Sequence, residues 1–160
     1  MSLYLHTMTK QIEIIRKTRT FLLKNLEDLT TEQYNKIPEG FNNNIIWNLG
    51  HMIAAQQGVC YIRAGLAPHV SESFINHYKS GSKPQGNVDA SGIEQIKSLL
   101  FSTLDQLEED YSNNIFGGYI AWTTRYDVEL TSIDDALNFI PFHEGLHSGC
   151  STVLKRLVTR

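Results

Sequence analysis

The sequence has few cysteines and no long apolar run, and each absence excludes a class of protein. With only 2 cysteines in 160 residues, Cys60 and Cys150, the chain is not a disulfide-stabilised secreted domain. No apolar run reaches the ~18 residues that a membrane span requires, and the segment MSLYLHTMTKQIEI lacks the pattern of a signal peptide. We therefore expect a cytoplasmic protein that does not bind membranes.

Positive charge is also scarce. Lys and Arg number 14 against 17 Asp and Glu, which gives a net charge of -3 with no basic cluster. This balance is not that of a nucleic-acid-binding protein. Hydrophobic residues make up 41% of the chain, which is enough to fill a core. At this length we expect one domain that spans residues 1–160.

Apolar residues recur at steps of three and four in four segments, which is the pattern of amphipathic helices. In the first segment, from Leu5 and Met8 to Leu29, the one charged residue on this apolar stripe is Arg19. Asparagine, aspartate and serine at the starts of the other segments fit helix N-caps. The other three predicted helices run from 42–44 to about 63, from 89 or 91 to about 111, and from 132 toward 160.

The segments between these helices are long. We predict a connection over 66–90 with a short helix near 74–78, and an ordered loop over 119–130, where no second strand pattern offers a partner. Pro141 is expected to bend or break the fourth helix. The predicted fold is all-α, a four-helix bundle with long inter-helix connections, and the order of the helices stays open.

Three histidines fall on the inward stripes of two predicted helices. His143 and His147 are four residues apart, so their rings lie one turn apart on one helix face, and His51 faces inward from the second helix. Three neutral imidazoles can hold a divalent ion such as Zn²⁺ or Ni²⁺ and leave coordination positions open. The alternative is three separately buried histidines, each with its own hydrogen-bond partner.

The segment from His143 to His147 also matches H-E-x-x-H, a signature of zinc proteases. Such proteases need a further ligand downstream, but no Glu, Asp or His follows His147, and Val153 stands where a third histidine belongs. We therefore exclude a protease. Glu144 is a candidate catalytic residue, either as a base or as a carboxylate that orients a ligand, and the alternative is a solvated helix carboxylate.

We also predict that Arg19, Asn48 and Cys150 line a substrate pocket. Arg19 either snorkels to the surface or enters the interior to bind an anionic substrate group or a buried carboxylate. Cys150 lies on the histidine face of the fourth helix. It is a fourth ligand, a redox-sensitive thiol or a small core residue.

Two motifs resemble a known family. Ile45-Ile46-Trp47-Asn48-Leu49-Gly50-His51 and Pro141-Phe142-His143-Glu144-Gly145-Leu146-His147-Ser148-Gly149 are similar to those of the DinB-like (DinB/YfiT-type) proteins, which are small four-helix bundles. The resemblance implies a metal triad at His51, His143 and His147, a divalent metal (zinc or nickel) and a homodimer. Members include S-transferases that use bacillithiol or glutathione and an isomerase that uses mycothiol. Cys150 stands where many members have Gln, so the pocket lining differs here.

Two functions follow as expectations. The first is a metal-dependent enzyme that acts on a small-molecule substrate, as a thiol S-transferase with a low-molecular-weight thiol cosubstrate or as a hydrolase. The second is a non-catalytic metal- or ligand-binding bundle that serves as a stress-related or dimerisation module. A bundle without metal is a third interpretation.

Overall fold

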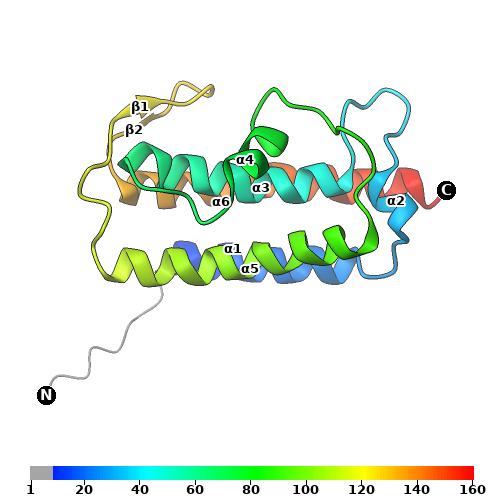
Figure 1. Cartoon of the computed structure of the whole chain (residues 1–160), viewed down its shortest axis with the longest axis horizontal. Coiled ribbons are helices and arrows are strands. Elements are labelled where there is room, and N and C mark those ends of the chain that lie inside the picture. Colours follow the sequence, from blue (N-terminus) through cyan, green and yellow to red (C-terminus); the bar gives the residue numbers. More distant parts are fainter. Residues whose placement is uncertain (1–8) are drawn as a thin grey trace, which may run out of the picture.

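Four long helices form most of the chain in the computed structural model, which describes residues 9–160 (Figure 1). The predicted all-α bundle is confirmed, although Leu5 and Met8 of the first apolar stripe lie outside the described residues. The four helices are α1 (Lys10–Asn25), α3 (Ile45–Cys60), α5 (Ala90–Ser112) and α6 (Ile133–Val158).

The helices begin at residues whose side chains accept backbone N–H groups of the first turn. Asn44 accepts from Trp47, Asp89 from Gly92 and Ser132 from Asp135. These are the N-caps that the sequence predicts. Since a cap fixes where a helix begins, it also fixes which residues face the interior.

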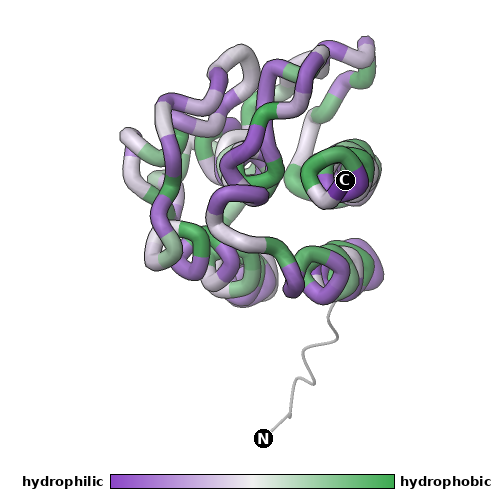
Figure 2. The backbone as a smooth tube through the Cα atoms, turned by 90° about the vertical axis from the view of Figure 1, so that its right-hand side faces the viewer, coloured by the Kyte–Doolittle hydropathy of each residue, from purple (hydrophilic) through white to green (hydrophobic). Residues whose placement is uncertain are grey.

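The helices pack in two layers. Figure 1 shows α3 and α6 in one layer and α1 and α5 in the other, and α1 also packs against α6. Seen along the long axis, each helix carries both hydrophobic and hydrophilic residues around its circumference (Figure 2), as amphipathic helices do.

Helices α1 and α6 run parallel. The amide of Gln11 donates to Asn138, and further along both helices Lys155 donates to the carbonyl of Asn25. Contacts that advance together along both segments require parallel helices. The long connections permit this arrangement, which the sequence left open.

The core consists of two apolar clusters. Leu22 of α1 and Leu26, the C-cap of that helix, belong to the first cluster, while Ile12 and Ile15 of α1 belong to the second. Arg19 stands between these pairs in sequence and is itself fully buried. The bundle therefore holds a charged residue between its two apolar clusters.

Short elements fill the connections. The expected short helix is present as α4 (Glu72–Tyr78). A 3₁₀ turn, η1 (Ile62–Ala64), follows α3, and Gly65 ends it in the left-handed conformation with φ 71°. Glycine adopts that conformation without steric cost. A further short helix, α2 (Thr31–Asn35), begins with a capping box.

The prediction of a loop over 119–130 is wrong for part of this segment. Strands β1 (Trp122–Thr123) and β2 (Glu129–Leu130) form an antiparallel hairpin in which Trp122 pairs with Leu130. Two-residue strands are too short for their alternation to show in the sequence. The hairpin lies at one end of the α3–α6 layer, on the side away from α1 and α5 (Figure 1).

Helix α6 is continuous through Pro141, so the expected break does not occur. Proline removes one backbone hydrogen bond. Buried Leu137 and Ile140 before it and Leu154 after it anchor both halves of the helix in the core. Among residues 9–160, no helix combines the length and apolar character needed to cross a bilayer.

Candidate metal centre

The three predicted histidines meet between two helices. His51 projects from α3, His143 and His147 project from α6, and one ring nitrogen from each lies within 4.8 Å of the others. The Nε2 atoms of His51 and His143 are 3.3 Å apart. In the part of the chain that the structure describes, no other group of three potential metal ligands converges in this way. The rings are therefore not three separately buried histidines.

Two neighbours hold the ring of His51. Trp47, one turn earlier on α3, stacks on it with ring centroids 4.8 Å apart and planes 7° apart. The backbone carbonyl of Tyr78, at the end of α4, lies 2.7 Å from Nδ1. A carbonyl only accepts hydrogen bonds, so Nδ1 carries the proton and Nε2 keeps its lone pair for a ligand.

Gly50 explains how α4 approaches so closely. A Cβ atom at this position would lie 2.5 Å from Cδ1 of Tyr78. Only glycine leaves room for the tyrosine ring against α3, and that ring position brings the Tyr78 carbonyl to His51.

Asn48 orients His147 in the same way. Its side-chain Nδ2 donates to the carbonyl of Asn44 at 2.8 Å and to Oδ1 of Asn43 at 3.1 Å. Oδ1 of Asn48 therefore faces Nδ1 of His147, 2.9 Å away, and accepts a hydrogen bond from it. Nε2 of His147 is left free. Asn48 was predicted to line the pocket, but it is absent from the cavity wall and contacts the ring of His147.

Burial keeps the three imidazoles neutral. Desolvation lowers the pKa of His51 from its ordinary 6.5. Desolvation, with smaller electrostatic effects from the neighbouring His51 and Arg125, lowers the pKa of His143 to about 4. Desolvation and the neighbouring histidines lower that of His147 to about 3. Neutral imidazole is the form that binds metals, so all three residues could act as metal ligands at neutral pH.

The donor set fits a divalent ion. Two nitrogens bound at 2.0–2.1 Å to one tetrahedral ion lie about 3.4 Å apart, close to the 3.3 Å between Nε2 of His51 and of His143. Zinc and nickel both accept imidazole ligands. Three protein ligands leave at least one coordination position open, as catalytic sites require.

The three histidines line the wall of a cavity of about 690 Å³. Helix α3 contributes small side chains there, Ala54, Ala55 and Gly58. The volume lies within the range of small-molecule sites in proteins. Free volume therefore lies beside the three histidines.

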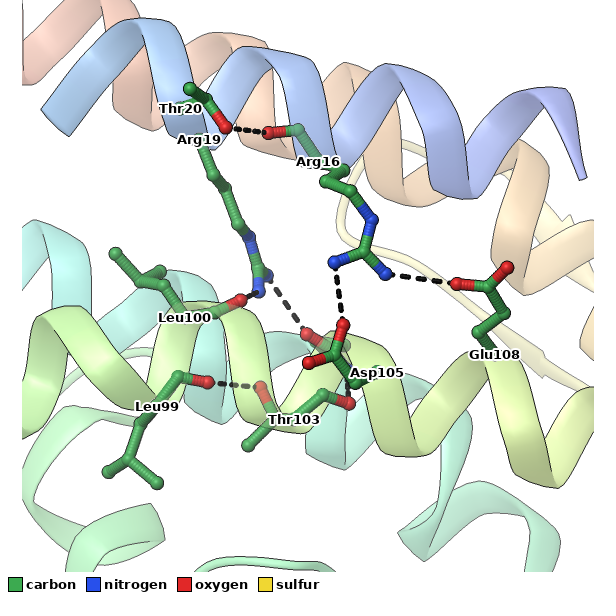
Figure 3. Close-up of polar contacts among 9 residues, drawn as sticks. Arg16, Arg19, Thr20, Leu99, Leu100, Thr103, Asp105 and Glu108 are labelled. Carbon is green, nitrogen blue, oxygen red and sulfur yellow. Dashed lines mark hydrogen bonds and ion pairs between the residues drawn. The ribbon is translucent and has the colours of Figure 1, made fainter. Parts of the chain in front are cut away.

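Arg19 lies in the core and not in the cavity wall. It is 0% exposed, and its Nη2 and Nε atoms lie 2.6 and 3.1 Å from the carboxylate of Glu144, which is 1% exposed. Arg19 also donates to Gln56 of α3 at 2.9 Å and to the carbonyl of Leu100 of α5. Figure 3 shows Arg19 reaching from α1 to Leu100. One residue thus joins all four long helices.

This arrangement decides between the interpretations of two residues. Arg19 binds a buried carboxylate, so neither the snorkelling alternative nor the pocket position describes it. Glu144 is not a solvated helix carboxylate. Its ion pair ties α6 to α1 between His143 and His147, and a catalytic role for Glu144 stays a prediction.

Cys150 is half-buried and packs against the first apolar cluster. Burial raises the pKa of its thiol. Cys150 belongs neither to the converging ligands nor to the cavity wall. Its surroundings match the core-residue interpretation and not a fourth ligand.

Some site residues carried no sequence signal. Tyr78 contributes a backbone carbonyl, which any residue could supply. Arg63, Lys79 and Arg125 line the cavity from three different connections. Only the fold brings them together, and neither spacing nor composition could have indicated it.

Comparison with known proteins adds one finding. A family model described as the DinB superfamily matches residues 14–151. This span includes all three histidines and all four long helices apart from the first residues of α1 and the last residues of α6. No curated protein matches the chain.

Proposed function

The chain belongs to the DinB superfamily, and on that premise we propose that it is a divalent-metal-dependent enzyme acting on a small molecule. Thiol S-transfer is the first candidate reaction, and hydrolysis is the second. One observation carries the proposal: three neutral imidazoles converge at the wall of a cavity large enough for a substrate.

Separate residues would bind the metal and orient its ligands. His51, His143 and His147 would hold zinc or nickel, while Asn48 and the Tyr78 carbonyl keep two of the rings in the ligating tautomer. When bound, such an ion supplies Lewis acidity, which lowers the pKa of a thiol or of water to near neutrality. Much of the cavity wall is apolar, which suits an apolar part of a substrate.

The alternative is a non-catalytic metal-binding module. A saturated site without a cavity would favour it. Glu144 is engaged by Arg19, Cys150 lies outside the group of ligands, and the three histidines line an open space. These observations support an enzyme.

A homodimer in the cytoplasm is part of the same proposal. Phe21 of α1 is 74% exposed, and Phe142, Leu146 and Val153 form an exposed apolar stripe on α6. Exposed apolar side chains on helix exteriors are candidates for a subunit interface. Analytical ultracentrifugation of the wild type and of F21S tests it, and a wild-type monomer would contradict it.

The proposed reaction is tested with the chain loaded with Zn²⁺ or Ni²⁺. It is incubated with glutathione, bacillithiol or mycothiol and a panel of electrophiles such as 1-chloro-2,4-dinitrobenzene, and separately with p-nitrophenyl esters. Mass spectrometry should detect thiol adducts, or absorbance measurements should detect ester cleavage. In either case the wild type should form product faster than H143A does. Rates equal to those of H143A on both panels would contradict an enzyme of either class.

A further inference from the structure

The cavity beside the three histidines is positively charged. Its wall includes Arg63 of η1, Lys79 after α4 and Arg125 between β1 and β2. Within residues 9–160, no Asp or Glu lines it. The chain as a whole has a net charge of -3. Three cations and no carboxylate of the described residues therefore line this cavity of an acidic protein.

Nothing in the described part of the chain neutralises these three cations. Every ion pair between its residues lies elsewhere. Lys79 donates to the amide oxygen of Asn76 at 2.9 Å, and the Arg63 guanidinium lies 4.2 Å from the ring centroid of Trp122. Stacking on an indole holds a guanidinium in place without using its N–H donors.

Most of the remaining wall is apolar and aromatic. Trp47 of α3, Trp122 and Tyr126 of the hairpin, and Phe139 of α6 contribute rings to it. Such surfaces bind planar or apolar groups, while charged groups at the edge fix their orientation. The combination suits a molecule with an apolar body and an anionic end.

We infer that the cavity selects carboxylate-bearing small molecules, with the carboxylate bound by Arg125 and Arg63 and the apolar body against the aromatic wall. This inference rests on the proposed function, since it names the substrate class of the same site. A guanidinium binds a carboxylate through two parallel hydrogen bonds, which a neutral amide of the same shape cannot match. Arg63 and Arg125 are therefore the residues that set specificity.

Binding of 2-naphthoate and its neutral analogue 2-naphthamide tests this inference by isothermal titration calorimetry. The chain is used as purified and again after metal removal, so that coordination of the carboxylate to a metal cannot account for a preference. We expect naphthoate to bind about tenfold more tightly than naphthamide in both samples, and to weaken at high salt. The double variant R63Q/R125Q should lose this preference.

R156Q is the matched control, because Arg156 is an exposed cation at the far end of α6. It should keep the wild-type preference. Equal affinities for the two probes, no binding of either, or a preference that R63Q/R125Q retains would overturn the inference. The metal content of the same samples is a separate readout, so a failure of the proposed metal site is distinguishable from a failure here.

Discussion

Oδ1 of Asn48 accepts a hydrogen bond from Nδ1 of His147 at 2.9 Å, which fixes the tautomer of a candidate metal ligand on a neighbouring helix. Removal of this acceptor in N48L should weaken zinc binding about 10- to 100-fold, because the ring loses its fixed orientation and tautomer. Competition with a chromophoric chelator measures the affinity.

N48D is the matched variant, since it keeps an oxygen acceptor opposite Nδ1. It should bind zinc at least as tightly as N48L does, and more tightly if its carboxylate increases the basicity of His147. Thermal unfolding of both variants monitors the fold. If N48L binds zinc as the wild type does, Asn48 has no role in orienting the ligand.

The Arg19–Glu144 pair predicts a large and asymmetric effect on stability. R19M leaves the Glu144 carboxylate buried without its partner, and should lower the free energy of unfolding by roughly 3–5 kcal/mol. The double variant R19M/E144L removes both charges and should recover much of that loss. Urea unfolding measures both, and similar stabilities for R19M and the wild type would rule out a structural role for the pair.

Two glycines of α3 give a matched comparison. G50A places a Cβ atom against the Tyr78 ring, 2.5 Å from Cδ1, and should cost about 1–3 kcal/mol and also weaken metal binding, because the Tyr78 carbonyl holds His51. G58A meets no atom within 4 Å among the described residues and should stabilise the helix by about 0.5–1 kcal/mol. Thermal unfolding measures the stability of both variants, and competition with a chelator measures their metal affinity. The same changes in stability and metal affinity in G50A and G58A would contradict this account of Gly50.

The buried histidines predict how stability depends on pH. In the folded chain the pKa of His143 is about 4 and that of His147 about 3, against 6.5 ordinarily. The unfolded chain therefore binds protons first, so the stabilising contribution is present above pH 6.5 and is lost as the pH falls toward the folded pKa values. Each histidine contributes at most about 1.4 kcal/mol per pH unit.

Urea unfolding of the metal-free chain at pH 7.5 and pH 5.0 measures this dependence. The wild type should lose more stability over that interval than H143Q/H147Q, which lacks both titrating groups. Equal losses would show that these imidazoles are not held neutral by the fold.

The sequence predicted the parts of this molecule that depend on local rules. Caps at Asn44, Asp89 and Ser132 and the three–four spacing of apolar residues located the helices, and the same spacing turned His51, His143 and His147 inward. Chemistry then followed from residue type. Imidazoles that meet inside a bundle suit a divalent metal.

Features that depend on contacts between distant segments were not predictable. Arg19 stood out as a charge on an apolar stripe, but its partner Glu144 lies 125 residues away. A loop was predicted over 119–130 because no second strand pattern offered a partner, whereas both strands of the hairpin lie within this one segment. The cations at 63, 79 and 125 come from three separate connections, which only the folded chain brings to one cavity.

The metal content of the purified, zinc-loaded chain tests the central claim most directly. Elemental mass spectrometry should find one metal ion per chain in the wild type and in the control variant H69A. In the wild type His69 is hydrogen-bonded to Asp110 and is not one of the three converging histidines. The same measurement should find a small fraction of that metal content in H51A, H143A and H147A. Equal metal content in all five proteins would contradict the three-histidine centre.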